Sequence, residues 1–228
     1  MTTTSSTGAW DEPPGLAARG TVILLTGRGE TARTYQRFGR RIATDAYRVR
    51  VVETDLDDLV TTRKQVEALL ADDDLPAPRV LAGSDTGASF ASQLADLADG
   101  VVLAGLALPD STPVTGWQSE LDARSACPTH QRVLSEDADF TRGALARPVP
   151  SDWVVAPSTV PTLVLHGDKD PVTPLAAAFA PFSEARLRTV VGGHHDVLND
   201  VSHRSVAATV VLFLESLKLG GDLPDIVV

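Results

Sequence analysis

The sequence predicts an α/β fold, a doubly wound and mostly parallel sheet that carries a short cap insertion. Apolar segments of strand length alternate with amphipathic segments of helix length over residues 20–110 and 159–219. This alternation is typical of parallel sheets covered by helices on both faces. Three predicted strands end in the polar clusters "GSDTG", "HGDKD" and "GGHHD". Because active groups collect at the carboxyl ends of strands in such sheets, these clusters are the main functional evidence.

Composition limits the class of protein. The 228 residues suit one α/β domain, and 43% hydrophobic and 22% charged residues fit a large core. The net charge of −10 argues against nucleic acid or an anionic membrane as a partner, since both bind clustered Lys and Arg. Cys127 is the only cysteine, which excludes an internal disulfide and fits a reducing compartment. The pattern shows neither a signal peptide nor a membrane span. We therefore expect a cytoplasmic protein that acts on a small molecule, and a homodimer is left open.

The first half of the chain begins with residues 1–19, which are rich in Thr, Ser, Gly and Pro and predict an irregular lead-in. Runs rich in β-branched residues and bounded by Gly or polar residues predict the strands. These strands are expected at 21–27, 48–55, 78–83 and 101–110. Apolar residues at helical spacing, such as Tyr35, Phe38 and Ile42, predict the helices between them. These helices are expected at 33–46, 59–73 and 88–99.

The second half begins with a change of pattern. Residues 111–158 contain Pro, Trp and charged residues without regular alternation, and we assign them to a short cap. The strand pattern returns at 161–174 and 186–196. A long helix with apolar periodicity is expected over 197–217. Residues 220–228 form a C-terminal tail.

Asp85 lies at the apex of the predicted turn "GSDTG", between Gly83 and Gly87. A sharp strand-to-helix turn lifts a nucleophile clear of the sheet, and small flanking residues are needed where the backbone crowds. The helix start that follows supplies the backbone N–H of Thr86 and a dipole that favours negative charge. Asp is also a preferred helix cap, so capping is the alternative interpretation. Ser84 lies one place before the apex, which disfavours a serine esterase.

The other two clusters supply a base and an acid. A histidine base needs a partner that fixes its tautomer. "GGHHD" offers His194 and His195, and Asp170 follows the preceding predicted strand, with Asp168 as the candidate for a structural turn residue. The chain order of Asp85, Asp170 and His195 is the nucleophile–acid–histidine order of the α/β-hydrolase fold. Over about residues 20–217 the sequence therefore resembles the α/β-hydrolase superfamily.

The resemblance implies roles for further residues. "LLTGRGETARTYQRFGRRI" looks like the first conserved loop of the superfamily, with Thr26 where a histidine is usual. The match implies that the backbone N–H groups of Arg28 and Thr86 form an oxyanion hole, and it favours His195 over His194 as the base. The aspartate elbow is similar to that of epoxide hydrolases and haloalkane dehalogenases. The body of the chain looks nearer to the lipases and esterases.

A carboxylate nucleophile at Asp85 suits saturated carbon rather than an ester. Attack on an ester carbonyl would give a mixed anhydride, whereas attack on an epoxide or carbon–halogen carbon gives a stable alkyl ester. His195, oriented by Asp170, would then activate water to hydrolyse that ester. We therefore expect a hydrolase that opens an epoxide, or a carbon–halogen bond, of a small organic molecule. No spacing typical of metal ligands is present, and we expect no cofactor.

The chain departs from both branches that it resembles. Epoxide hydrolases of this fold use two cap tyrosines to protonate the leaving oxygen, but Tyr35 and Tyr47 are the only tyrosines and lie outside 111–158. Haloalkane dehalogenases usually have Trp directly after the nucleophile, where this chain has Thr86. A different acid is required, and the sequence does not identify it.

Alternatives stay open for the lining of the substrate pocket and for the reaction class. Gly27, Trp117 and Trp153 are candidates for lining the pocket, although aromatic cap residues also serve in packing. A non-hydrolytic enzyme such as a lyase or cyclase, in which Asp85 and His195 move protons without an adduct, stays open, as does an esterase-like enzyme. A degenerate protein that binds a small ligand is the third class.

Overall fold

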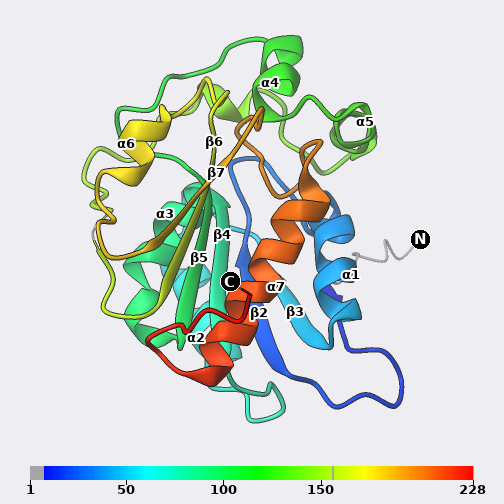
Figure 1. The fold of residues 1–228 in the computed structure, drawn as a ribbon. Helices are drawn as coiled ribbons and strands as arrows, with labels where there is room; N and C mark the ends of the chain where they lie inside the picture. The colour runs from blue at the N-terminus through cyan, green and yellow to red at the C-terminus, as the bar shows by residue number, and fades with distance from the viewer. Residues whose placement is uncertain (1–7, 156, 228) are drawn as a thin grey trace.

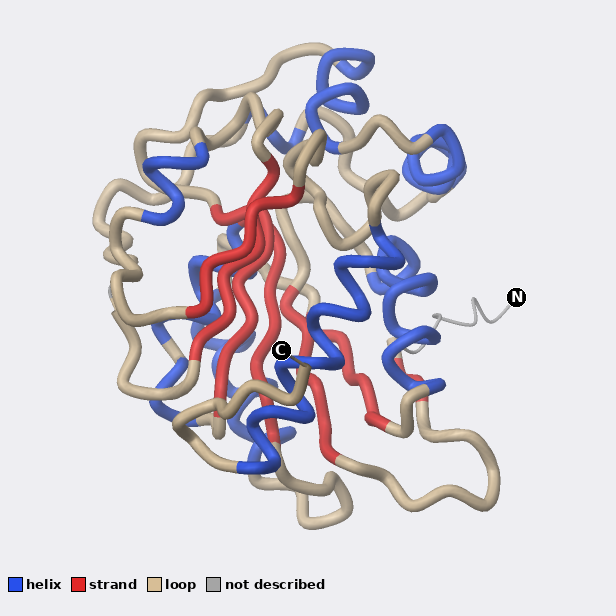
Figure 2. The backbone as a smooth tube through the Cα atoms, in the orientation of Figure 1, coloured by secondary structure: helices blue, strands red, loops and turns tan. Residues whose placement is uncertain are grey.

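The computed structural model describes residues 8–155 and 157–227, and its centre is a seven-stranded sheet (Figures 1 and 2). The strands are β1 (Ala9–Trp10), β2 (Gly20–Leu25), β3 (Tyr47–Val52), β4 (Arg79–Asp85), β5 (Gly100–Leu106), β6 (Thr162–Gly167) and β7 (Arg186–Val190). Their order in the sheet is β1-β3-β2-β4-β5-β6-β7, and every neighbouring pair is parallel except β1 with β3. The predicted doubly wound, mostly parallel sheet is confirmed.

Helices cover both faces of this sheet, as Figure 1 shows. The helices of the core are α1 (Gln36–Thr44), α2 (Leu59–Leu70), α3 (Thr86–Gln93), α6 (Leu175–Phe179) and α7 (His203–Leu219). Alternate residues of each buried strand point to opposite faces: Val22 and Leu24 of β2 belong to the apolar cluster beneath α1 and α7. Ile23 and Leu25 belong to the cluster beneath α2 and α3. The strands β2, β5 and β6 are buried along their whole length, so their sequences are mostly apolar rather than alternating.

The predicted lead-in and tail differ in part from the structure. Residues 1–7 and 228 lie outside the described residues. In the described part of the lead-in, β1 pairs antiparallel with β3 through Ala9 and Trp10, which the sequence pattern did not indicate. An edge strand of two residues is too short to show a periodicity.

The last helix begins later than predicted, at His203 rather than at 197. Asp200 holds the preceding segment in a loop, because its carboxylate accepts hydrogen bonds from the backbone N–H groups of His194, Ala126 and Val201 at 2.8–2.9 Å. Side chains of this kind offer the backbone an alternative to helix. The loop is what carries His195 to the carboxyl end of the sheet.

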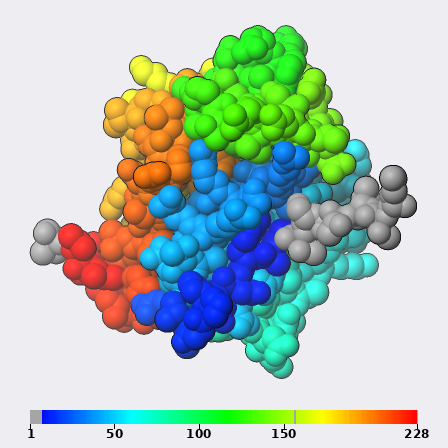
Figure 3. Space-filling model, turned by 90° about the vertical axis from the view of Figure 1, so that its right-hand side faces the viewer, coloured from blue at the N-terminus to red at the C-terminus, as the bar shows by residue number. Residues whose placement is uncertain are grey.

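The cap region lies over the carboxyl ends of the strands and contains α4 (Trp117–Arg124) and α5 (Pro128–Glu136). In the space-filling view its green residues form a continuous layer over the blue first third of the chain (Figure 3). The sequence pattern missed both helices. In α4 the residues fully buried against the core include Glu120 and Arg124, so charged side chains hide its helical periodicity. Within residues 8–155 and 157–227, no helix combines the length and apolar character required to cross a membrane.

Candidate active site

Asp85 ends β4 and adopts a backbone conformation that non-glycine residues rarely occupy, with φ 53° and ψ −125°. The turn is tight enough that a Cβ on Gly83 would lie 2.3 Å from the carbonyl oxygen of Gly87, and one on Gly87 would lie 2.4 Å from that of Leu25. The two glycines are therefore steric requirements of the elbow. The Asp85 side chain makes no capping hydrogen bond to α3, so the alternative of a simple helix cap is wrong.

His195 stands between two carboxylates. Its Nε2 lies 3.0 Å from Oδ1 of Asp85, and its Nδ1 lies 2.8 Å from Oδ2 of Asp170. The loop after β6 fixes Asp170, because its other oxygen accepts the backbone N–H of Thr173 at 3.2 Å. His166 on β6 places Nε2 2.9 Å from Asp170 Oδ2. The structure thus brings the three predicted residues, from three separate strand ends, into one hydrogen-bonded chain.

The sequence neighbours of the three candidate catalytic residues do not join their hydrogen-bonded chain. His194 turns away from Asp85 and pairs with Asp200 at 3.0 Å. Asp168 accepts the backbone N–H of Gly192 at 2.7 Å, a loop-to-loop contact. Ser84 is buried and has no hydrogen bond to His195 among the described residues. These positions favour Asp85, Asp170 and His195 over their sequence neighbours.

Arg28 contacts Asp85 with both its backbone and its side chain. The backbone N–H donates to Oδ2 of Asp85 at 2.7 Å, which is the group that the oxyanion-hole prediction requires. The guanidinium forms a two-pronged pair with the same carboxylate, with Nε 2.9 Å from Oδ2 and Nη2 2.7 Å from Oδ1. Thr86 begins α3, where a backbone N–H has no partner within the helix. Its hydroxyl lies 3.4 Å from Asp85 Oδ2.

The ion pair to the Arg28 side chain was missed from the sequence. The sequence contained a signal for it, because the resemblance places the backbone N–H of Arg28 near Asp85. A guanidinium at that position can reach the Asp85 carboxylate. Asp85 is 1% exposed and Arg28 is 4% exposed. A buried carboxylate of this kind requires a positive partner.

Charge is balanced within the site. Although burial opposes it, the charges of Arg28 and His195 hold the pKa of Asp85 well below its usual range. Burial also disfavours a charged His195, yet the Asp170 and Asp85 carboxylates raise its pKa to about 9. Against its burial, His195 and His166 lower the pKa of Asp170. At neutral pH the resting site therefore holds two carboxylates, one imidazolium and one guanidinium.

A second buried charge network holds the loop that contains Arg28. Arg124, from α4 of the cap, donates to Oε1 of Glu30 at 2.7 Å, to the carbonyl oxygen of Arg28 at 2.7 Å and to Oε1 of Glu120 at 2.8 Å. Glu30 in turn accepts the backbone N–H of Gly27 at 2.9 Å. The backbone N–H groups of Gly27 and Arg28 and the carbonyl oxygen of Arg28 are thus each bonded to a buried charged side chain. This arrangement preorganises the predicted oxyanion loop.

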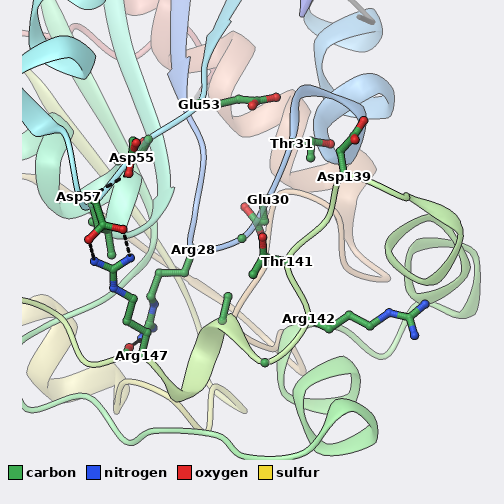
Figure 4. Close-up of a pocket in the computed structure, with 15 residues that line it drawn as sticks. Arg28, Glu30, Thr31, Glu53, Asp55, Asp57, Asp139, Thr141, Arg142 and Arg147 are labelled. Carbon is green, nitrogen blue, oxygen red and sulfur yellow. Dashed lines mark hydrogen bonds and ion pairs between the residues drawn. The ribbon is translucent and has the colours of Figure 1, made fainter. Parts of the chain in front are cut away.

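A cavity of about 610 Å³ adjoins the site beside Arg28 (Figure 4). It lies between the loop after β2, the loop after β3 and cap residues 139–147. Its charged lining residues are Arg28, Glu30, Glu53, Asp55, Asp57, Asp139, Arg142 and Arg147. Asp57 and Arg147 form an ion pair at 2.7 Å across it. The Arg28 side chain separates the cavity from Asp85, because its Nη1 donates to the carbonyl oxygen of Arg147 while Nη2 holds Asp85.

The three residues predicted to line a pocket lie outside that lining. Gly27 lies against Asp85, since a Cβ there would be 2.8 Å from the Cβ of Asp85. Trp117 packs on Phe140 in the cap at 5.6 Å between ring centroids. Trp153 stacks on Phe90 of α3 at 5.8 Å. Both tryptophans therefore take the packing role that the sequence left as the alternative.

Among the described residues there is no group of three or more His, Cys, Asp or Glu side chains that could hold a metal ion. The chemistry that the arrangement offers is acid–base and nucleophilic. A carboxylate at an elbow, a histidine bonded to it and a second carboxylate behind the histidine are the parts required.

Comparison with known proteins supports the fold. No protein-family model matches the sequence, and no curated protein matches it. Among solved structures, a monoglyceride lipase from Saccharomyces cerevisiae is similar over 92% of this chain and 90% of its own, with 14% identity and a TM-score of 0.70. A monoacylglycerol lipase from Paleococcus ferrophilus covers 92% and 97%, with 17% identity and a TM-score of 0.68. A thioesterase domain from the curacin biosynthetic pathway covers 89% and 93%, with 17% identity and a TM-score of 0.60. The chain has the α/β-hydrolase fold.

Proposed function

We propose that this chain is a hydrolase in which Asp85 is a covalent nucleophile that opens an epoxide, or displaces halide, in a small organic molecule. The observation that carries the proposal is the hydrogen-bonded chain from Asp85 through His195 to Asp170, with Asp85 at the strained apex of the elbow. The similar structures named above include lipases and a thioesterase, which supports hydrolysis as the general reaction.

In the first half-reaction a carboxylate oxygen of Asp85 attacks a saturated carbon. Its lone pair forms the new C–O bond, while the bond from that carbon to the epoxide oxygen or halogen breaks and its electron pair leaves with that atom. The enzyme becomes an alkyl ester at Asp85. The deeply lowered pKa of Asp85 keeps the nucleophile ionised at neutral pH.

In the second half-reaction the neutral form of His195 takes a proton from water, and the oxygen of that water adds to the ester carbonyl of Asp85. The backbone N–H of Arg28, 2.7 Å from Oδ2 in the resting site, holds the oxyanion together with the N–H of Thr86. Collapse releases the alcohol and restores the carboxylate. Loss of the Asp85 charge in the ester removes one cause of the raised His195 pKa, so the histidine becomes a better base when a base is required.

Trapping the ester tests the proposal. His195→Gln keeps a polar side chain but removes the base, so the adduct should accumulate when this variant is incubated with styrene oxide or (2-bromoethyl)benzene. Intact-mass spectrometry and peptide mapping should place one phenylethyl-type group on Asp85. The Asp85→Asn/His195→Gln double variant is the matched control and should gain no mass at that peptide. If neither probe modifies Asp85 while the wild type still turns over an epoxide, the covalent mechanism is wrong.

A general-base enzyme without an adduct is the second candidate, and one observation favours it. In the resting site both oxygens of Asp85 already accept hydrogen bonds from Arg28, and one also contacts His195. A single turnover in H₂¹⁸O with excess enzyme separates the two candidates. A covalent ester puts an unlabelled oxygen from Asp85 into the first product, whereas direct attack by activated water labels the product.

A further inference from the structure

The Arg28 side chain is placed at the boundary between the nucleophile and the cavity. The side chain is 3% exposed, and its guanidinium pairs with Asp85 through Nε and Nη2 and donates through Nη1 to the carbonyl oxygen of Arg147. A guanidinium has five N–H groups. Three are engaged in these contacts, so two have no partner among the described residues, and the side chain that carries them lines the cavity.

Opening an epoxide moves a negative charge by a short distance. The charge is on Asp85 before attack, and afterwards it is on the oxygen that was released from the attacked carbon. A buried alkoxide without a positive partner or a hydrogen-bond donor would be strongly disfavoured. The chain has no cap tyrosine to supply a donor, because Tyr35 lies in the segment before α1 and Tyr47 begins β3.

We propose that the Arg28 guanidinium binds the departing oxygen and is the electrophilic group of the ring-opening step. This inference rests on the proposed function and adds a role for a side chain whose backbone N–H alone was implicated by the sequence. As substrate enters from the cavity, its oxygen replaces Asp85 as the partner of Nη2. Oδ1 of Asp85 then loses its shortest contact and keeps those to His195 Nε2 at 3.0 Å and to Arg28 Nε at 3.2 Å, and a remaining lone pair attacks the carbon. The same cation pairs with the charge at both ends of its path, so a preorganised positive partner is present where the charge develops on the departing oxygen.

The step balances with groups that the site holds. A lone pair of Asp85 forms the carbon–oxygen bond, and the ring bond breaks with its pair on the substrate oxygen. That alkoxide, held by Arg28, takes the Nε2 proton of His195, which is protonated in the resting site because its pKa is raised to about 9. His195 is then the neutral base that the hydrolysis of the ester requires.

Leaving-group dependence tests the proposal. In the His195→Gln background the alkoxide held by Arg28 takes its proton from water instead of from His195, and every variant compared shares that background. The rate of adduct formation on Asp85 is measured there with styrene oxide and with (2-bromoethyl)benzene. The two probes share a phenyl group and a two-carbon chain, but the first releases a strongly basic alkoxide and the second a weakly basic bromide. Arg28→Gln keeps the backbone N–H and removes the cation. It should slow the epoxide reaction by about 100-fold, the size expected for loss of one preorganised donor, and leave the bromide reaction unchanged or faster.

Two further variants complete the design. Arg48→Gln removes another arginine that forms a two-pronged pair with a carboxylate, Glu12, at the edge of the sheet, and should leave both rates unchanged. Arg28→Lys keeps the positive charge in case Arg28→Gln does not fold, and it should recover part of the epoxide rate. Equal slowing of both probes in the Arg28 variants would assign Arg28 to packing alone and overturn the inference, while the adduct itself would stand. Absence of an adduct with both probes in the His195→Gln parent would instead refute the proposed function.

Discussion

The protonation of His195 predicts a particular loss of stability at alkaline pH. Its pKa rises from 6.5 to about 9 on folding, and one pKa unit corresponds to about 1.36 kcal/mol. The folded state therefore favours the imidazolium by on the order of 3 kcal/mol. Because the folded pKa is raised, this stability is fully present below pH 6.5. It falls as pH rises from 6.5 to about 9 and is absent above that.

Urea unfolding at pH 6 and at pH 9.5 measures this effect. The wild type should lose on the order of 3 kcal/mol more of its unfolding free energy between these pH values than His195→Gln does, since the variant has no proton to release at this site. His203→Gln is the matched control. Burial and the nearby charges of Arg37 and Arg41 lower the pKa of His203 to about 4, so this histidine is neutral in the folded state at both pH values. In the unfolded chain it still binds protons near pH 6, so the His203→Gln variant should differ from the wild type by less than about 1 kcal/mol and in the direction opposite to His195→Gln.

Two results would refute this reasoning. An NMR titration that places the midpoint of His195 near 6.5 would show that the two carboxylates do not hold its proton. Equal changes in the unfolding free energy of the wild type and of His195→Gln between pH 6 and pH 9.5 would show the same. Either result would also remove His195 as the donor to the released oxygen.

Three other changes should have measurable effects. Gly87→Ala places a Cβ 2.4 Å from the carbonyl oxygen of Leu25, so it should lower the unfolding free energy by about 1–3 kcal/mol and displace the elbow, as judged by calorimetry and by loss of adduct formation. His130→Leu removes the buried imidazole whose Nε2 lies 2.7 Å from Asp196. A loss of about 1–3 kcal/mol, the cost of leaving a buried polar group without a partner, is expected in urea unfolding, and a wild-type midpoint would contradict it. Asp85→Asn should abolish adduct formation and bring the NMR titration midpoint of His195 down from about 9, because one of the two carboxylates that raise it is gone.

The candidate catalytic residues were predictable because their signals are local. The turn between Gly83 and Gly87 requires small residues for a steric reason that any sequence with this turn shares. Asp170 follows β6, whose apolar run is clear in the sequence, and His195 follows β7, which is more polar and was placed by the glycines and histidines after it. The polar clusters at three strand ends therefore carried enough information to place three side chains in one site.

The parts that were missed depend on contacts between distant segments. The inward face of α4 carries Glu120 and Arg124, whose burial is explained only by partners such as Glu30 in another segment. The side chain of Arg28 could have pointed to solvent, and only the position of Asp85 after folding determines that it does not. Periodicity detects apolar faces, and it cannot detect a buried face that is made of paired charges.

The network around Arg124 has a consequence for how this protein could diversify. Removing one partner from a buried charge pair costs about 3–5 kcal/mol, which is a large part of the stability of an ordinary domain. Arg124 comes from the cap and its partner Glu30 from the core, so a cap taken from another protein of this fold would leave Glu30 buried without its counter-ion. The cap is therefore not an interchangeable module. New substrate range is more accessible through single substitutions at exposed positions of the cavity wall, such as Thr141 and Arg142, that leave the network whole.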